Sequence, residues 1–330
     1  MISPGDQGKQ VLDLQQRLLK LGYAISSAER DGWFGPSTEE ALIAFQRERR
    51  LRPDGLCGEQ TWSELLEANH RLGDRLLYEK TPSLKGDDVA ALQHRLNSLG
   101  FHSGREDGIF GKATGQAVRT FQRNVGVVVD GIFGPDTHLA LERLGFHGGL
   151  SVATIREIEE LRSGRPEGSH LSIHLSVQPE LDVLGLAVQR ALSADGHSTV
   201  IMPSDSDEVV ADRANLANLD LLLSLRQGDG PLSSIVYFTG RHTRSERAFH
   251  LATHIANACQ RHSTLATIEL YGRPHPLLRQ TSMPALIFEL GLTGEEMGRT
   301  LVQHSSEIGR LIASGIYTAF RTAESTSLSS

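Results

Sequence analysis

The sequence predicts a multidomain protein in which two small all-α modules of three helices each precede an α/β domain with a central mixed sheet. Two observations lead to this fold class. The first half of the chain contains an internal repeat, and from residue 169 onward apolar strands alternate with amphipathic helices. Repeats of this kind mark tandem structural units, whereas strand–helix alternation is typical of an α/β sheet. A chain of 330 residues is long enough for this organisation.

The composition is that of an ordinary globular protein, with 39% hydrophobic and 22% charged residues. A formal charge of −7 argues against a nucleic-acid partner, because such a partner requires a basic surface. We find neither a secretory signal pattern nor an apolar run of about 18 residues, so no membrane span is expected. The two cysteines, Cys57 and Cys259, are far apart in the sequence, which fits a reducing compartment. We therefore expect a cytoplasmic protein.

The repeat defines the two modules. DGWFGPSTEEALIAFQRE (31–48) recurs as DGIFGKATGQAVRTFQRN (107–124), which places one module at 1–69 and the other at 80–147. Each module contains an Asp-Gly…Gly…Thr pattern twice. An Asp-Gly pair forms a tight turn whose glycine is free to adopt positive φ, and the segments that follow have the apolar spacing of helices. The turn-motif residues are Asp31, Gly32, Gly35, Asp54, Gly55, Asp107, Gly108, Gly111, Asp130 and Gly131.

This pattern resembles the peptidoglycan-binding domain of cell-wall hydrolases, a small three-helix module with the signature DGxFGxxT…AxxxFQ. The resemblance covers both modules nearly end to end. It implies that the modules bind glycan-peptide fragments of peptidoglycan or their precursors. We interpret the motif residues themselves as structural, because turns and helix starts account for them. The residues of a ligand groove are not predicted from the sequence.

The second half is expected to follow a linker, 148–168, which carries a short amphipathic helix. The α/β domain is expected over 169–321, and the polar tail, 322–330, is expected to be disordered. Thr322 and Thr326 are candidate phosphorylation sites, with an inert chain end as the alternative. Strands are predicted at 170–177, 198–202, 219–226, 233–238 and 284–291, and helices at 180–197, 211–218, 245–262 and 295–320.

Three segments of the α/β domain resemble the zinc-dependent N-acetylmuramoyl-L-alanine amidase family. They are ELDV (180–183), RANLANLDLLLSLR (213–226) and LLRQTSMPALIFELG (277–291). The resemblance implies that active members hold one zinc ion through His, Glu and His, with a second glutamate that activates water. Three protein ligands leave an open position at which the metal acidifies water and polarises the amide carbonyl. The second carboxylate takes and returns the proton.

Carried over to this chain, Glu180 matches the glutamate ligand and Glu289 matches the general acid/base. Arg226 stands where the second histidine is expected, and the loop that carries the first histidine is missing. A guanidinium has no lone pair for a metal, and at about 5 Å it would repel a divalent ion by roughly 6 kcal/mol at an effective dielectric constant of about 20. We therefore predict that the domain binds no zinc and catalyses nothing. Arg226 is predicted to form an ion pair between Glu180 and Glu289 in place of the metal.

Other histidines are the alternative source of metal ligands. His250 and His254 have i, i+4 spacing, which suits chelation, but no third ligand is evident from the sequence. We interpret these and the remaining histidines as ordinary polar residues. The histidines considered are His170, His174, His242, His250, His254 and His275.

The order of domains resembles that of the actinobacterial CwlM-type proteins, in which two such modules precede a degenerate amidase domain. This resemblance implies a non-catalytic, cytoplasmic regulator or scaffold of peptidoglycan precursor synthesis. It also implies three partners: UDP-N-acetylglucosamine enolpyruvyl transferase, a flippase for lipid-linked precursor and a Ser/Thr kinase. Two alternatives stay open. One is an active amidase that holds zinc through an unusual ligand set, and the other is a plain wall-binding protein.

Overall fold

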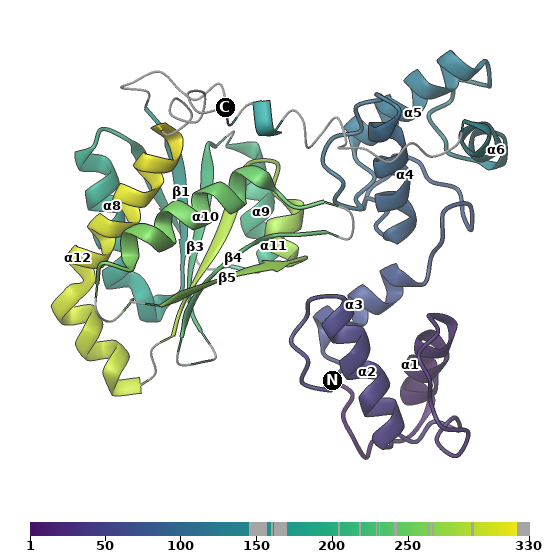
Figure 1. Cartoon of the computed structure of the whole chain (residues 1–330), viewed down its shortest axis with the longest axis horizontal. Helices are drawn as coiled ribbons and strands as arrows, with labels where there is room; N and C mark the ends of the chain where they lie inside the picture. Colours follow the sequence, from purple (N-terminus) through teal and green to yellow (C-terminus); the bar gives the residue numbers. More distant parts are fainter. Residues whose placement is uncertain are drawn as a thin grey trace, which may run out of the picture. The chain divides into compact units, whose positions relative to one another are not determined.

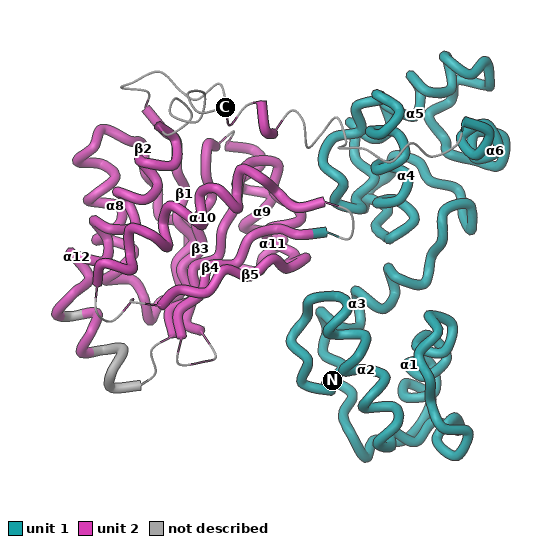
Figure 2. The backbone as a smooth tube through the Cα atoms, in the orientation of Figure 1, with its two compact units in different colours: residues 1–153, 240–242 teal, residues 154–239, 243–330 magenta. Residues whose placement is uncertain are grey.

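A computed structural model of the chain describes residues 1–144, 157–159, 161, 170–203, 205–217, 219–228, 230, 232–240, 243–262, 265, 267–291 and 294–321. The chain forms two compact units, unit 1 with residues 1–153 and 240–242, and unit 2 with residues 154–239 and 243–330 (Figure 2). None of the helices in the described ranges is long and apolar enough to span a membrane. Most of the predicted linker, 148–168, and the tail with Thr322 and Thr326 lie outside the described residues.

Unit 1 contains two three-helix modules, as the sequence predicts (Figure 1). Each module buries an apolar core of its own, with Leu14 and Phe45 in the first and Leu92 and Phe121 in the second. The helices are α1 (Lys9–Lys20), α2 (Pro36–Glu48) and α3 (Glu59–Ala68) in module 1, and α4 (Asp87–Ser98), α5 (Lys112–Val125) and α6 (Pro135–Arg143) in module 2.

A buried glutamine closes the first turn of the repeat. The side-chain amide of Gln15, on α1, donates to the backbone carbonyls of Glu29 and Trp33 at 2.7 and 2.8 Å. The same nitrogen donates to the hydroxyl of Thr38 at 3.0 Å, and the amide oxygen accepts the Gly32 N–H at 3.1 Å. Because both ends of this buried amide have partners, the turn is held in one conformation.

The other three turns contain a similar arrangement, in which the motif aspartate takes the place of one backbone carbonyl. The amide nitrogens of Gln46, Gln93 and Gln122 each donate to the aspartate carboxylate, a backbone carbonyl and the threonine hydroxyl of their motif, at 2.8–3.4 Å. Their oxygens accept the N–H of the glycine in each Asp-Gly pair, and these glycines have φ between 71° and 79°. Only glycine adopts this φ without strain. The Asp, Gly and Thr residues of the motif therefore serve the fold.

Unit 2 is built on a six-stranded sheet in the order β2-β1-β3-β6-β4-β5. Strands β2, β1, β3 and β6 are parallel, β4 is antiparallel to β6, and β5 is parallel to β4. This mixed sheet confirms the predicted fold class. The strands are β1 (Ser172–Val177), β2 (Ser198–Met202), β3 (Leu221–Gln227), β4 (Ser233–Phe238), β5 (Ile268–Arg273) and β6 (Ala285–Leu290).

Helices cover both faces of the sheet (Figure 1). Leu223 of β3 points to the face that packs against α8, α10 and α12, whereas Leu222 points to the face that packs against α9 and α11. Since neighbours along a strand alternate between faces, this division also assigns a face to every polar residue of the strands. The helices are the short 3-10 helix η1 (Pro179–Leu181), α8 (Asp182–Ala194), α9 (Asp207–Leu216), α10 (Glu246–Cys259), α11 (Pro276–Gln280) and α12 (Gly294–Arg321).

Two elements, β5 and α11, were not predicted, and α9 begins earlier than predicted. The sequence of β5, IELYGR, has charged residues and a glycine that interrupt its apolar pattern, and the strand lies at the edge of the sheet. Helix α9 begins at Asp207 rather than at 211. Ser206 precedes it, and Asp207 and Glu208 occupy its first turn, which is a recognisable start signal that the prediction passed over.

We expect Gln15→Leu to destabilise module 1 by about 2–3 kcal/mol, because it removes the hydrogen-bond partners of the Gly32 N–H and the Glu29 carbonyl. Both tryptophans of the chain, Trp33 and Trp62, belong to this module, so urea unfolding followed by tryptophan fluorescence reports on it. Gln16→Leu is the control, because Gln16 is adjacent on the same helix and exposed. Equal unfolding midpoints for the two variants would contradict the role of Gln15.

Candidate functional site

Polar side chains form a row at the carboxyl end of the parallel strands. Arg226 of β3 lies opposite Glu289 of β6 in the ladder, and Glu289 lies opposite Ser234 of β4. Cross-strand partners point to the same face, which here is the face covered by α9 and α11. The Ser234 hydroxyl donates to the Glu289 carboxylate at 2.6 Å. We call these residues, together with Asp207 and His275 described below, the sheet-edge site.

Arg226 is held by an ion pair to the first turn of α9. Its terminal nitrogen Nη2 donates to the Asp207 carboxylate at 2.5 Å, and its Nε donates to the Ser224 hydroxyl at 2.9 Å. Both charged side chains are about one quarter exposed. A charge-assisted contact of this kind holds the guanidinium in one position. Asp207 was not predicted as a site residue, although the acidic first turn of α9 marks it as a residue at a helix start.

The predicted ion pair of Arg226 with Glu180 and Glu289 was wrong. Glu180 is exposed in η1, directly before α8, and α8 packs on the opposite face of the sheet. Glu289 shares the face of Arg226, but its carboxylate accepts the Ser234 hydroxyl. Among the described residues, the ion-pair partner of Arg226 is Asp207.

His275 completes the sheet-edge site. Its Nε2 lies 3.6 Å from the Asp207 carboxylate, and its Nδ1 is buried without a hydrogen-bond partner among the described residues. Burial lowers the pKa of His275 from 6.5 to about 4; the Asp207 charge opposes this shift, and the Arg226 charge adds to it. The imidazole is therefore neutral near pH 7, and the charges of Arg226 and Asp207 balance each other beside it.

The other candidate histidines do not build a metal centre with these residues. His174 points to the same sheet face, its Nδ1 is buried without a partner among the described residues, and burial lowers its pKa. His250 and His254 contact each other on α10, while His170 is exposed. His242 lies outside the described residues. Within the described ranges, the sheet-edge site brings no three metal-ligating side chains together.

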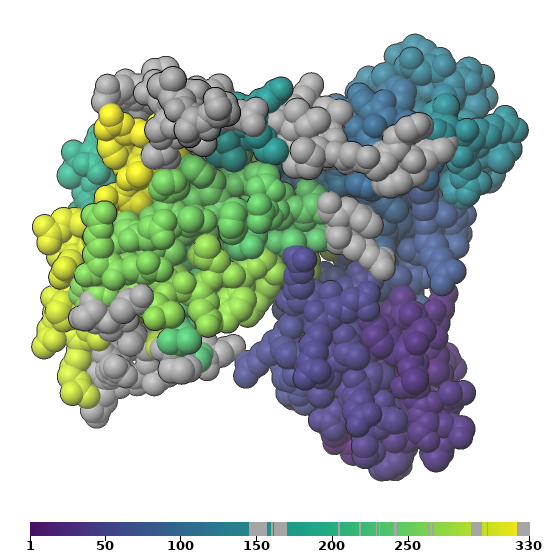
Figure 3. All heavy atoms as spheres, in the orientation of Figure 1, coloured from purple at the N-terminus to yellow at the C-terminus, as the bar shows by residue number. Residues whose placement is uncertain are grey.

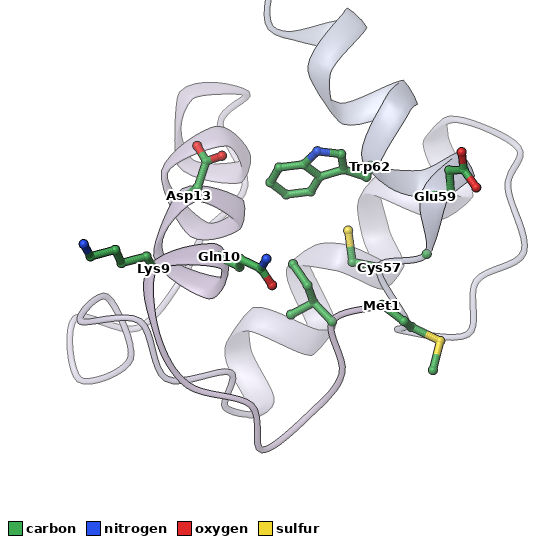
Figure 4. Close-up of a pocket in the computed structure, with 9 residues that line it drawn as sticks. Met1, Lys9, Gln10, Asp13, Cys57, Glu59 and Trp62 are labelled. Atoms are coloured by element: carbon green, nitrogen blue, oxygen red, sulfur yellow. The ribbon is translucent and has the colours of Figure 1, made fainter.

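Module 1 contains a groove of about 420 Å³ (Figure 4). Trp62 of α3 and Asp13 of α1 lie on opposite sides of it. The guanidinium of Arg17 lies 5.7 Å from the indole centroid and 3.0 Å from the Asp13 carboxylate. Burial raises the pKa of Cys57 to about 11, so this residue offers a thiol and not a thiolate. The lining residues are Met1, Ile2, Lys9, Gln10, Asp13, Cys57, Gly58, Glu59 and Trp62.

The second module does not repeat the chemistry of this groove. His138 occupies the repeat position of Trp62, and Phe133 occupies that of Cys57. The rings of Phe133 and His138 contact each other, with their centroids 5.6 Å apart. None of the groove residues was predicted from the sequence. The difference between the two copies at this position is the sequence signal from which Trp62 could have been predicted as a groove residue.

Known proteins are similar to the helical modules and to the α/β domain of this chain. Residues 7–65 and 85–141 match the family model of the putative peptidoglycan binding domain. Over 96% of its length, the chain is 31% identical to the N-acetylmuramoyl-L-alanine amidase CwlM of Mycobacterium tuberculosis, and the match covers 88% of that protein. A probable N-acetylmuramoyl-L-alanine amidase of Bacillus licheniformis is 30% identical over 42% of this chain and 43% of its own length. Among solved structures, the N-acetylmuramoyl-L-alanine amidase AmiC2 of Nostoc punctiforme aligns with 44% of this chain and 96% of its own, at 19% identity and a TM-score of 0.37.

The two helical modules and the mixed-sheet domain define a peptidoglycan-binding protein with an amidase-like domain. The chain belongs to the CwlM family, because the match at 31% identity runs through the modules and the α/β domain alike. Its function is therefore related to peptidoglycan, and the family match of the modules supports peptidoglycan fragments as their ligand.

We expect the ring of His275 to titrate near pH 4 in an NMR titration of the chain's histidines, with its signal assigned by its loss in His275→Asn. Between pH 6.5 and about 4, the unfolded chain takes up a proton that folded His275 does not. His275 should therefore contribute a loss of stability of unit 2 as the pH falls through this window, by at most about 1.4 kcal/mol per pH unit, and His275→Asn should lack this contribution. A midpoint at 6.5 or above would contradict the burial of this ring.

Proposed function

We propose that the protein is a non-catalytic, cytoplasmic regulator or scaffold of peptidoglycan precursor synthesis that binds peptidoglycan fragments or precursors through its modules. The observation that carries the proposal is the Arg226–Asp207 ion pair, because the amidase resemblance places a zinc ligand at the position of Arg226. The buried thiols of Cys57 and Cys259 lie in different units and form no disulfide, which is compatible with a reducing compartment.

Electrostatics supports the absence of a metal from the sheet-edge site. A catalytic zinc ion needs three protein ligands, and the carboxylate nearest to Arg226 is already neutralised by it. Withdrawing Asp207 to bind a metal would leave a partly buried guanidinium beside a divalent cation, without its counter-ion. Glu180 is exposed at the start of a helix on the other face of the sheet. We therefore propose that this domain keeps the amidase fold without its cofactor and acts by binding.

Amide hydrolysis is the second candidate function, and one observation favours it. Glu289 is present at the carboxyl end of β6, half-buried and hydrogen-bonded to Ser234, where a general acid/base would stand. Two relatives also carry the name N-acetylmuramoyl-L-alanine amidase. Hydrolysis by this chain would need a zinc ligand set other than the one the resemblance implies.

We expect the purified full chain to release no stem peptide from soluble peptidoglycan fragments, with or without added Zn²⁺, under conditions in which an active amidase digests them. Chromatography of the products measures the release. Release by the wild-type chain that disappears in Glu289→Gln would establish hydrolysis and refute the proposal.

Module 1 is proposed as the principal ligand-binding module. Its groove combines the half-buried indole of Trp62 with the side chains of Gln10, Asp13 and Glu59. An aromatic face packs against the C–H groups of a sugar ring, and carboxylate and amide groups bind hydroxyl and peptide groups. Small-molecule sites typically have this mixture of an apolar wall and a few polar side chains.

Trp62→Ala should weaken the binding of a soluble muropeptide by about tenfold or more, because a central tryptophan often contributes over 2 kcal/mol to binding. Isothermal titration calorimetry measures this change. His138→Ala removes the residue at the same repeat position in module 2 and should leave the affinity within about twofold. Equal losses in the two variants would contradict the assignment of binding to module 1.

A further inference from the structure

A cluster of metal-ligating side chains lies outside the sheet-edge site. His262, His304 and Glu307 place their ligand atoms within 4.8 Å of one another, and within the described part of the chain no other group of three does so. Nε2 of His262 lies 3.6 Å from a carboxylate oxygen of Glu307, and Nδ1 of His304 lies 4.0 Å from the same oxygen. The two imidazole rings contact each other, with centroids 4.9 Å apart.

Two elements that are distant in the sequence hold this cluster. His262 lies in the turn after α10, where its N–H donates to the Cys259 carbonyl and its own carbonyl accepts the Leu265 N–H. Cys259 and Leu265 are fully buried, and the His262 side chain is only 4% exposed. His304 and Glu307 are three residues apart on α12, which places both on one face of that helix. The buried imidazole is thus fixed, and two surface side chains face it.

We infer that His262, His304 and Glu307 form a binding site for a divalent transition-metal ion of the zinc type. Two imidazoles and one carboxylate are ligands that Zn²⁺ accepts. Bonds of about 2.0–2.2 Å place tetrahedral ligand atoms roughly 3.3–3.5 Å apart, closer than in the metal-free arrangement. The side chains of His304 and Glu307 are 41% and 54% exposed, so they have room to rotate toward His262. Because these two side chains are at the surface, the fourth coordination position of the ion is open to water.

The inferred zinc site is separate from the sheet-edge site. Helices α10 and α12 cover the face of the sheet opposite to Arg226, and their surface is part of the face shown in Figure 3. A metal ion here ties the turn after α10 to α12, and it stabilises the folded unit because the ligands converge only in the folded chain. Zinc in a purified sample of this protein is therefore no sign of amidase activity.

The test uses the full chain without a polyhistidine tag, stripped of metal by a chelator. Titration calorimetry with Zn²⁺ gives the affinity and stoichiometry, and the visible absorption of added Co²⁺ reports its coordination geometry. We expect one ion per chain. His304→Ala and Glu307→Gln should each weaken binding by about tenfold or more, and the double variant should abolish it. Both residues lie on the surface, so circular dichroism should show an unchanged fold.

Two variants are matched controls. His254→Ala removes an imidazole that also contacts a neighbouring histidine on α10, and His275→Asn alters the sheet-edge site. Both should bind Zn²⁺ with the wild-type affinity. Absence of binding by the wild-type chain would overturn the inference, and so would binding that survives in the double variant. If His275→Asn lost Zn²⁺ binding and His304→Ala kept it, the metal would lie at the sheet-edge site, and this result would also overturn the inference.

Discussion

The ion pair between Arg226 and Asp207 determines the chemistry available at the carboxyl end of the sheet. Strand β3 delivers the guanidinium to this edge, and α9 delivers the carboxylate in its first turn, where the helix dipole stabilises a negative charge. A guanidinium keeps its charge at every physiological pH and offers no lone pair. The position of Arg226 therefore carries a fixed positive charge and no metal-ligating atom. His275 stays neutral beside the pair because it is buried.

Folding and recognition use different residues in the two modules. The buried glutamine of the preceding helix engages the Gly and Thr residues of the motif in all four turns, and in three of them it also engages the Asp carboxylate. Residues committed to such a network are not available to a ligand. This leaves for our proposed ligand site the positions outside the motif, such as Trp62 in module 1, which is His138 in module 2.

The sheet also separates the two groups of ionisable residues in unit 2. Arg226, Asp207 and His275 belong to the face covered by α9 and α11, whereas His262, His304 and Glu307 belong to the layer of α10 and α12. Successive side chains of a strand point to opposite faces of the sheet, and each face is covered by a densely packed apolar layer. A ligand bound by one group therefore has no direct contact with the other.

The sequence by itself determined the modules and the fold class, because turns and helices depend on residues close together in the chain. Asp-Gly pairs, helical spacing and apolar strands are local patterns, and the long helices and the central strands were predicted from them, whereas the five-residue helix α11 was not. Strand β5 was not predicted, because an edge strand can contain polar residues that interrupt its apolar pattern. Only the tertiary structure decided that Asp207, not Glu180 or Glu289, neutralises Arg226. It alone also brought Trp62 opposite Asp13 and His262 beside α12. Such contacts join residues that are far apart in the chain. They are set by the order of the strands and the packing of the helices, and no local sequence pattern encodes these.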